Sequence, residues 1–275
     1  MTLGAEELQE VARRIRIDII DMTTAAGSGH PGGSLSSADL LAALYFRVMN
    51  VFPDDPYNDA RDRFVLSKGH AAPVLYAALA ERGFFPVREL LTLRKIGSRL
   101  QGHPAYREPP GVEVTTGSLG QGLSMACGIA LAARMDGKPY RTYCLLGDGE
   151  LQEGQNWEAA MFARKYGLSN LTAFVDRNRL QITGGTEEAM PLEPLPEKFR
   201  AFGWNVIIID GHNMRQIIEA CGKASRAEKN PTVIIMNTVK GKGVSFMENQ
   251  AEWHGKACSQ EEHDRAVAEL RGEAQ

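Results

Sequence analysis

TYCLLGDG at residues 142–149 and LTAFVDRN at residues 171–178 are the two stretches that decide the fold. Each opens with a short apolar run, Thr142 to Leu146 in the first and Leu171 to Val175 in the second, and such runs predict buried strands. Between them, Trp157 to Tyr166 has the apolar spacing of a helix. A strand, a helix and a second strand in this order predict two parallel strands joined by a crossover helix.

The same alternation continues on both sides of this unit. Arg63–Leu66, Trp204–Ile209 and Thr232–Met236 are further strand candidates, and Asn213 is placed to cap a following helix. We therefore predict an α/β fold, a mostly parallel sheet with helices on both faces. Because there is no internal repeat and no low-complexity linker, we expect residues 1–275 to form one domain.

Three connecting regions are harder to assign. Ser36 is expected to open a helix with Asp39 as its capping-box partner, so His30–Gly33 before it should be a loop. The stretch between Asn178 and Trp204, rich in proline and glutamate, is also expected to be a loop. Gly97 to Thr116 is predicted to be a long surface loop, and loops of this length are usually functional or mobile.

Composition excludes several classes of protein. Hydrophobic residues make up 43% of the chain, an ordinary globular value that excludes disorder and coiled coil. With 31 basic and 34 acidic residues, the chain does not have the charge of a protein that neutralises a nucleic-acid backbone. The cysteines are scattered without a Cys-x-x-Cys pair, the first residues do not resemble a signal peptide, and no apolar run reaches the ~18 residues of a membrane span. We expect a soluble cytoplasmic protein.

Oxygen-bearing side chains follow the two deciding strands. Asp148 comes directly after the first strand and Asn178 shortly after the second. Ligands of such sheets bind at the carboxyl ends of the strands, and a bend at Asn178 would also present the carbonyl of Leu180. These three oxygens, with two from a diphosphate and one from water, would complete the octahedral shell of Mg²⁺. A plain glycine turn at Gly147–Gly149 is the simpler interpretation of either piece alone, but the joint spacing favours the metal site.

These residues resemble the signature of a known family. Gly147-Asp148-Gly149 followed by Asn178 looks like the thiamine diphosphate signature, and the surrounding region, residues 147–185, is similar to transketolases in particular. Further matches stand in transketolase order over nearly the whole chain: Gly29-His30-Pro31-Gly32, Ser67-Lys68-Gly69-His70, Gly102-His103-Pro104, Thr115-Thr116-Gly117-Ser118-Leu119-Gly120-Gln121-Gly122 and Asp210-Gly211-His212. Several motifs in one order make the resemblance specific.

The resemblance implies thiamine diphosphate and Mg²⁺ as cofactors. It assigns the metal to Asp148, Asn178 and the Leu180 carbonyl, where the family more often has isoleucine. The residues that it places against the cofactor are Gly117, Ser118, Leu119, Gly149, Asn178, His70 and His254. The family usually has proline where Ser118 stands, a difference that loosens the loop but keeps its backbone donors.

The resemblance also assigns catalytic roles. It places His30, His103 and His254 at the carbonyl and hydroxyl groups of a sugar. A neutral imidazole suits this task because one ring nitrogen donates a hydrogen bond and the other accepts one. Glu153 would belong to a carboxylate link between paired active sites, although a first-turn acid favoured by the helix dipole is an equal alternative. His212 is expected to order a turn, and His263 is expected to be solvated.

Transketolases are more than twice as long as this chain, which looks like only their first domain. The pyrimidine-binding domain has no counterpart here and is expected on a separate chain. The resemblance thus implies the diphosphate-binding subunit of a split transketolase, a transferase of the pentose phosphate pathway that moves a two-carbon ketol unit from a ketose phosphate to an aldose phosphate. Two copies of each chain, a heterotetramer, would complete the assembly.

Other functions remain open at this point. The donor could be a branched sugar or a sulfosugar, or the chain could resemble 1-deoxyxylulose-5-phosphate synthase. A non-catalytic regulatory subunit would keep the fold without the cofactor. A nicotinamide-dependent oxidoreductase is disfavoured, because Gly117–Gly122 has the wrong glycine spacing for a dinucleotide fingerprint. Gly241-Lys242-Gly243 fits a phosphate loop or a flexible connector equally well, and the sequence identifies neither the ketose donor nor the aldose acceptor.

Overall fold

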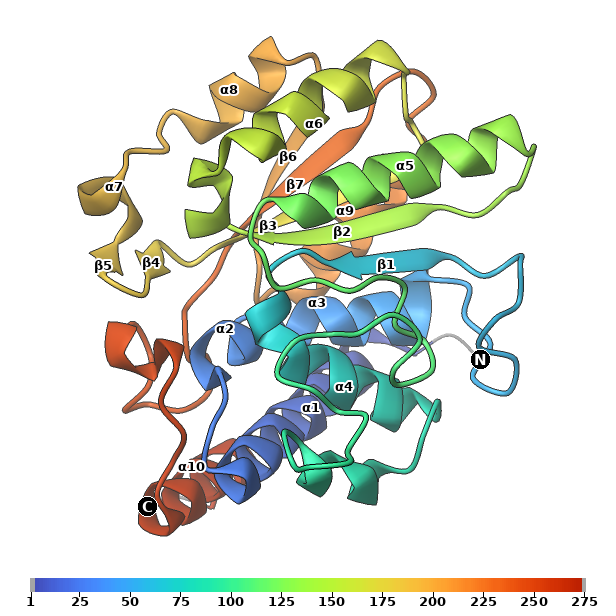
Figure 1. Ribbon diagram of the computed structural model, residues 1–275. Coiled ribbons are helices and arrows are strands. Elements are labelled where there is room, and N and C mark those ends of the chain that lie inside the picture. Colours follow the sequence, from blue (N-terminus) through green and yellow to red (C-terminus); the bar gives the residue numbers. More distant parts are fainter. Residues whose placement is uncertain (1–2, 274–275) are drawn as a thin grey trace.

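The core of the molecule is a five-stranded parallel sheet with the strand order β1-β2-β3-β7-β6 (Figure 1). A computed structural model describes residues 3–273. The strands are β1 (Arg63–Leu66), β2 (Thr142–Gly147), β3 (Leu171–Arg177), β6 (Asn205–Asp210) and β7 (Thr232–Asn237). Every predicted strand is present, and all four pairings are parallel. The predicted α/β fold is therefore confirmed.

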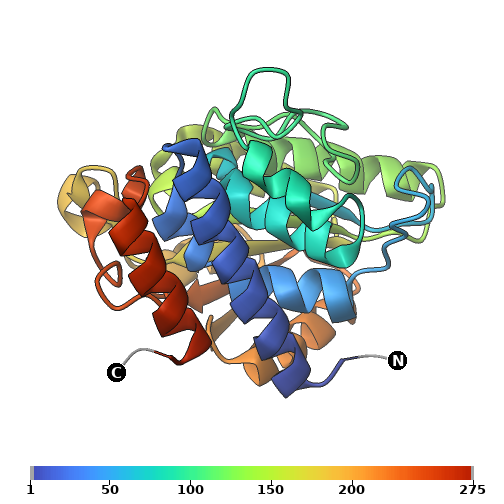
Figure 2. The same ribbon diagram turned by 90° about the horizontal axis from the view of Figure 1, so that it is seen from below.

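Helices cover both faces of this sheet, as Figure 1 shows. One face carries α5 (Gln121–Met135), α6 (Gly154–Lys165) and α8 (Leu195–Ala201). The other face carries α1 (Ala5–Ala26), α3 (Ala38–Ala43), α4 (Ala72–Arg82) and α9 (Met214–Ser225). In Figure 2, α10 (Gln260–Arg271) lies beside α1. No helix within residues 3–273 is both long and apolar enough to cross a bilayer.

Short elements complete the chain. They are the helices α2 (Pro31–Leu35) and α7 (Thr186–Ala189), the hairpin strands β4 (Leu180–Gln181) and β5 (Gly184–Gly185), the π-helical turn η1 (Leu44–Val48), and the 3₁₀ turns η2 (Gly69–Ala71), η3 (Val87–Thr92), η4 (Gly149–Gln152) and η5 (Ala251–His254). Between η3 and α5 the chain forms no helix or extended strand, in agreement with the predicted long loop.

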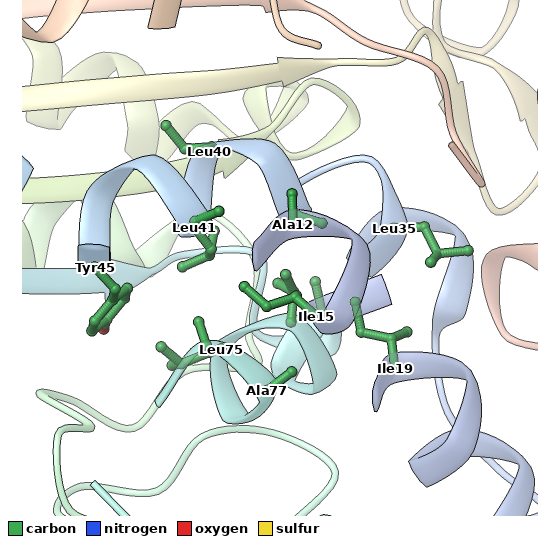
Figure 3. Packing of buried hydrophobic residues seen from close by; sticks show 14 of the residues in the cluster. Ala12, Ile15, Ile19, Leu35, Leu40, Leu41, Tyr45, Leu75 and Ala77 are labelled. Carbon is green, nitrogen blue, oxygen red and sulfur yellow. The ribbon is translucent and has the colours of Figure 1, made fainter. Parts of the chain in front are cut away.

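The sheet separates two hydrophobic cores because successive side chains of a strand point to opposite faces. Phe174 of β3 belongs to the core under α1 and α4, while its neighbour Val175 belongs to the core under α5 and α6. Figure 3 shows the first core, where Ile15 of α1 lies near Leu75 of α4. The helical spacing of apolar residues in α1 places most of them on this buried face.

Two predictions near the N-terminus are wrong. Pro31–Leu35 is a helix rather than a loop. Proline is favourable at the first helical position, because the N–H that it lacks would have no hydrogen-bond partner within the helix. Ser36 does not N-cap the next helix: its hydroxyl donates to Asp176 at 2.7 Å, and Asp39 pairs with Arg16 instead. Both side chains are used for long-range contacts that local patterns do not reveal.

The stretch between β3 and β6 also differs from its prediction as a loop. It contains the β4–β5 hairpin, α7 and α8. Pro196 lies in the first turn of α8, where a missing N–H costs nothing. Leu195 and Phe199 are four residues apart and bury one side of this helix. The many proline and glutamate residues of the stretch conceal that short apolar spacing.

Candidate functional site

A cavity of about 320 Å³ lies at the carboxyl ends of the parallel strands. Its walls come from residues that follow β1, β2, β3 and β7. The predicted site residues that line it are His70, Leu119, Asp148, Gly149, Glu153, Asn178, Leu180 and His254. Segments more than 180 positions apart in the sequence thus contribute to one site, as expected for ligand binding in a parallel sheet.

The register of β2 and β3 explains why Asp148 and Asn178 share this wall. Gly147 pairs with Asp176, so the chain leaves both strands at the same edge. Arg179 then adopts a left-handed backbone conformation with φ 65°, which turns the chain back toward the cavity. Its N–H donates to Oδ2 of Asp148 at 2.5 Å, which ties the two strand ends together.

Asp148 is 2% exposed and therefore needs compensation for its charge. Burial and the nearby Asp176 carboxylate raise the pKa of Asp148, while the N–H of Arg179 and the guanidinium of Arg177 lower it. Arg177 lies 3.1 Å from Oδ2 and is itself 2% exposed. The role of Arg177 was not predicted, because a charged residue inside an apolar strand gives no indication of its partner.

Asn178 is oriented by the fully buried Asp176. Nδ2 of Asn178 donates to Oδ2 of Asp176 at 3.1 Å, and the same carboxylate oxygen lies 2.5 Å from Nζ of Lys68. The hydroxyls of Ser36 and Thr238 also donate to the Asp176 carboxylate. The amide nitrogen is committed to Asp176, and Oδ1 accepts the N–H of Leu180 at 3.1 Å, which leaves its second lone pair for another ligand.

Two buried lysines lie beside this corner, and neither was predicted from the sequence. Nζ of Lys68 donates to the carbonyl of Gly33 at 2.7 Å in addition to its ion pair with Asp176. Nζ of Lys240 donates to the Leu180 carbonyl at 3.3 Å and lies 3.0 Å from Nδ1 of His254. Burial and the neighbouring Lys68 lower the pKa of Lys240 to about 8.

A signal for Lys240 was present in the sequence but was assigned to the wrong lysine. The segment Lys240-Gly241-Lys242-Gly243 contains two candidates, and the phosphate-loop prediction concerned Lys242. In the structure Nζ of Lys242 pairs with Glu248 at 3.1 Å, outside the cavity. Gly241–Gly243 is therefore a connector, and Lys240, 2% exposed, is the lysine that lines the cavity.

The corner fits a divalent cation with an anionic diphosphate. Within residues 3–273 no three His, Cys, Asp or Glu side chains cluster as metal ligands. The donors here are one carboxylate, one amide oxygen and the Leu180 carbonyl, which already accepts from the Lys240 ammonium. Mg²⁺ suits such a small set of hard oxygens, because it usually keeps waters and phosphate oxygens in its shell. The two lysines supply positive charge for the phosphates.

Three predicted histidines form a cluster beside the cavity. The rings of His30, His70 and His254 have centroids 5.0 to 5.5 Å apart. Burial, together with nearby cations, lowers the pKa of His30 to about 4 and that of His254 to about 3, and it lowers the pKa of His70 strongly. All three are therefore neutral near pH 7, as a combined donor and acceptor role requires.

His103, Gly117 and Ser118 lie next to the cavity but not in its wall. A Cβ built on Gly117 would lie 3.2 Å from the His103 ring, so the glycine allows this close approach. Gly117 has φ 152°, a conformation that other residues rarely adopt. Burial and the charge of Arg94 lower the pKa of His103, although the side chain is exposed.

Glu150 holds the cavity loops together, a role that was not predicted from the sequence. Its buried carboxylate accepts hydrogen bonds from Ser67 Oγ and from the N–H groups of Gly120 and Gly147, at 2.5 to 3.0 Å. Glu153, three residues later, is exposed at the start of α6. Nothing in the sequence distinguishes these two acids, and the proposed role of Glu153 between paired sites stays a prediction.

The two remaining histidines have structural contacts. Nδ1 of His212 lies 2.8 Å from Asp39, and Nε2 accepts the N–H of Val239 at 2.8 Å, so the ring has a structural role, but it joins distant segments rather than ordering its own turn. The prediction that His263 is solvated is wrong. It lies 2.7 Å from Asp21 of α1 because α10 packs beside that helix.

The fold and the cavity together define a class: α/β proteins with a ligand site at the carboxyl edge of a parallel sheet. The comparison with known families is more specific. The family described as "Transketolase, thiamine diphosphate binding domain" matches residues 7–272. The chain belongs to this family, and the predicted resemblance to transketolases and their cofactor, thiamine diphosphate, is confirmed.

Curated relatives divide into two groups by length. The chain is 50% identical to the 6-deoxy-6-sulfo-D-fructose transketolase subunit SqwG of Clostridium sp. and 47% identical to an apulose-4-phosphate transketolase subunit of Phocaeicola vulgatus. These alignments cover 97% and 98% of this chain and 97% and 95% of the relatives. The chain is 46% identical to human transketolase, aligned over 98% of its own length but only 43% of that protein.

Solved structures give the same assignment. The transketolase of Campylobacter jejuni superposes with a TM-score of 0.91 at 33% identity, and that of Leishmania mexicana with 0.88 at 32%. The superpositions cover 98% and 97% of this chain, but only 43% and 44% of those chains. The chain thus spans less than half the length of the solved transketolases that it matches.

Proposed function

We propose that this chain is the thiamine diphosphate-binding subunit of a split transketolase, a transferase that moves a two-carbon ketol unit between sugar phosphates. The observation that carries the proposal is the cavity in which Asp148, Asn178 and the Leu180 carbonyl meet two buried lysines. Two relatives of nearly the same length are named as transketolase subunits, which supports this assignment.

In this proposal the corner between β2 and β3 holds Mg²⁺ and the diphosphate. Asp148, Asn178 and the Leu180 carbonyl would ligate the metal, and Lys68 and Lys240 would face the phosphates. Gly149, Gly117, Ser118 and Leu119 would supply backbone contacts. Once bound, thiamine diphosphate supplies the nucleophile for the ketol transfer. The chain's own task is to hold that group and to exclude water around it.

The histidines would handle the sugar. His70 and His254 line the cavity and would contact the cofactor, while His30, His103 and His254 would meet the carbonyl and hydroxyl oxygens of the substrate. Because the pKa values of these histidines are lowered, each ring donates from one nitrogen and accepts at the other at pH 7. A neutral donor aimed at an oxygen that gains negative charge stabilises that charge during the transfer.

A separate partner chain would supply the pyrimidine-binding part of the site, and two copies of each chain would form the assembly. Exposed apolar side chains on α5 and α6, among them Met125, Met161 and Phe162, support such contacts. Glu153 begins α6 at the cavity wall and would take part in a carboxylate link between paired sites. The four buried free cysteines fit the cytoplasm.

The identity of the ketose donor is a separate question. One relative is named for 6-deoxy-6-sulfo-D-fructose and another for apulose 4-phosphate, so similar chains carry the names of different ketoses. A sulfosugar or branched-sugar donor is therefore a second candidate beside the ketose phosphates of the pentose phosphate pathway. Product analysis with a panel of ketose donors, run on the assembled enzyme, distinguishes them.

The test of the proposal combines activity with binding. We expect ketol transfer only when the chain is mixed with its partner, and full activity of the isolated chain would contradict the split-subunit assignment. In the assembled complex, calorimetric titration should show Mg²⁺-dependent binding of thiamine diphosphate. Asp148→Ala should abolish that binding, whereas Asp136→Ala, at the exposed end of α5, should not change it. Equal binding by both variants would contradict the assigned corner.

A further inference from the structure

Arg94 lies outside the cavity wall and has no assigned role, yet it reaches the histidine cluster. It follows η3 in the long loop and has a left-handed backbone conformation, φ 58°, which is unfavourable for a residue with a side chain. Its N–H donates to the Leu100 carbonyl at 2.8 Å and closes the loop. An unfavourable backbone conformation persists only where the surrounding contacts stabilise it. We therefore ask what the side chain of Arg94 contacts.

The guanidinium of Arg94 is held between three segments. Nη1 donates to Oγ of Ser28 at 2.8 Å, and Nη2 lies 3.4 Å from Nδ1 of His30. It also packs flat against Gly102: a Cβ built there would lie 3.0 Å from both Cζ and Nε of the arginine. A side chain at position 102 would therefore push the guanidinium away, and the contact places the guanidinium one residue from His103.

In the hydrogen bond between Arg94 and His30, only the arginine can be the donor. A guanidinium carries five N–H donors and no acceptor, and it stays protonated in proteins. Nδ1 of His30 must therefore be the acceptor, so the proton of the neutral ring is on Nε2. Nε2 points toward Gly255, where a built Cβ would lie 3.6 Å away, on the side of the His254 ring.

We infer that Arg94 is a positioning residue for His30: its guanidinium occupies Nδ1, fixes the ring orientation and keeps the proton on Nε2, the nitrogen on the side of Gly255 and the His254 ring. This inference rests on the proposed function, in which His30 meets a sugar oxygen. An Nε2–H donor is what a developing oxyanion needs, whereas the other tautomer would present a lone pair to it.

The charges around His30 agree with this role. Arg94, Lys240 and His103 face the ring and, after burial, are the groups that lower its pKa. The neighbouring rings of His70 and His254 complete its surroundings. Because these partners are cationic or neutral and no carboxylate is among them, nothing favours a second proton on the ring.

The first test reads the tautomer directly and needs no activity. In the full chain labelled with ¹⁵N-histidine, His30 should be the Nε2–H tautomer at pH 7, with its signal assigned by its loss in His30→Gln. Arg94→Met should increase the Nδ1–H tautomer and raise the pKa of His30. Arg99→Met is the matched control, because Arg99 lies in the same loop but pairs with Glu89. An unchanged His30 spectrum in Arg94→Met would overturn the inference.

A milder variant guards against a folding defect in Arg94→Met. Ser28→Ala removes the hydroxyl that anchors Nη1 and leaves both Arg94 and His30 in place. It should shift the His30 tautomer in the same direction by a smaller amount, and an unaltered tautomer population in this well-folded variant would also count against the inference.

The second test uses the complex reconstituted with its partner. Arg94→Met should lower kcat on the order of 100-fold, the effect of a misplaced catalytic group, with little change in KM for the ketose donor. If Arg94 acts through His30, this loss should disappear in a His30→Ala background, and additive losses would overturn the inference. A complex without any ketol transfer would contradict the proposed function, while the tautomer of His30 would still decide the role of Arg94.

Discussion

Lys240 and Lys242 are two residues apart and occupy opposite environments. Lys240 is buried against the Leu180 carbonyl and His254, while the Lys242 ammonium pairs with Glu248 at a partly exposed position. The carbonyl that Lys240 contacts is one of the proposed metal ligands, so this lysine lies where a diphosphate would place its negative charge. At the scale of single residues, the site depends on which of these two lysines, separated by one glycine, points into the cavity.

Replacing each lysine separately tests this assignment. Lys240→Met should weaken binding of thiamine diphosphate about 10- to 100-fold, because a charge-assisted hydrogen bond contributes about 1.5–3 kcal/mol. Lys242→Met removes the same charge two residues away and should leave the affinity nearly unchanged. Calorimetric titration of the assembled complex in the presence of Mg²⁺ measures both, and equal losses would show that only long-range charge matters.

At the scale of elements, Arg177 anchors the hairpin and α7 to the sheet. It is the last residue of β3, and its guanidinium donates to Asp148, to Thr186 and to the acids Glu187 and Glu193, at 2.8 to 3.1 Å. The hairpin that it anchors carries Gln181 and Ile182, which form part of the cavity wall. The buried guanidinium of Arg177 therefore links the segment between β3 and α8 to Asp148 in the proposed metal corner.

Removing this cation should be costly. Arg177→Met leaves the buried Asp148 carboxylate without its only ion-pair partner among the described residues, so we expect the free energy of unfolding to fall by about 3 kcal/mol. Arg200→Met, which breaks an exposed pair with Glu197 in α8, should change it by less than about 1 kcal/mol. Urea denaturation followed by circular dichroism gives both values. Similar stabilities for the two variants would be inconsistent with the anchoring role.

The contact between α1 and α10 should make the stability of the protein depend on pH. Burial lowers the pKa of His263, but the hydrogen bonds to Asp264 and Asp21 outweigh burial and raise it above its usual 6.5. A raised folded-state pKa adds stability that is fully present below the unfolded pKa and is lost as pH rises through the folded pKa. His263→Ala should therefore lower Tm at pH 5.5 more than at pH 9. A pH-independent difference in thermal melts would refute this account.

At the scale of the whole molecule, one sheet serves two cores. Phe174 and Val175 are adjacent in β3 and point into different cores, and Trp253 and Trp204 report on them separately. Because every central strand contributes to both cores, neither core can lose its packing without disturbing the strand that supports the other. The prediction that residues 1–275 form one domain therefore becomes the prediction that both cores unfold in one cooperative transition.

A single unfolding transition is the expected result. Trp253 fluorescence, Trp204 fluorescence and circular dichroism should give coincident urea curves. Phe174→Ala should shift all of them together, by about 3–5 kcal/mol, and Val175→Ala should also shift all of them. Tryptophan-to-phenylalanine variants isolate each signal. Separate transitions for the two tryptophans would show that the cores unfold independently and that the chain contains two units.

The sequence by itself determined the order of the main strands and helices, the α/β class, the family, and half of the residues that line the cavity. These features depend on apolar spacing within ten to fifteen residues and on motifs that are short and contiguous. Asp148 and Asn178 were found from their place at the strand ends, because parallel strands bring their carboxyl ends to one edge. His70 and His254 came from the resemblance to the family.

Only the tertiary structure decided which side chains support those residues. Lys68 and Asp176 are 108 positions apart, and Arg94 and Ser28 are 66 apart, so no local pattern relates them. Whether Ser36 caps a helix or bonds to Asp176, and whether Lys240 or Lys242 faces the cavity, depends on how distant segments pack. Packing selects these partners because a buried charge or hydroxyl must find a hydrogen-bond partner among whatever the fold brings near it.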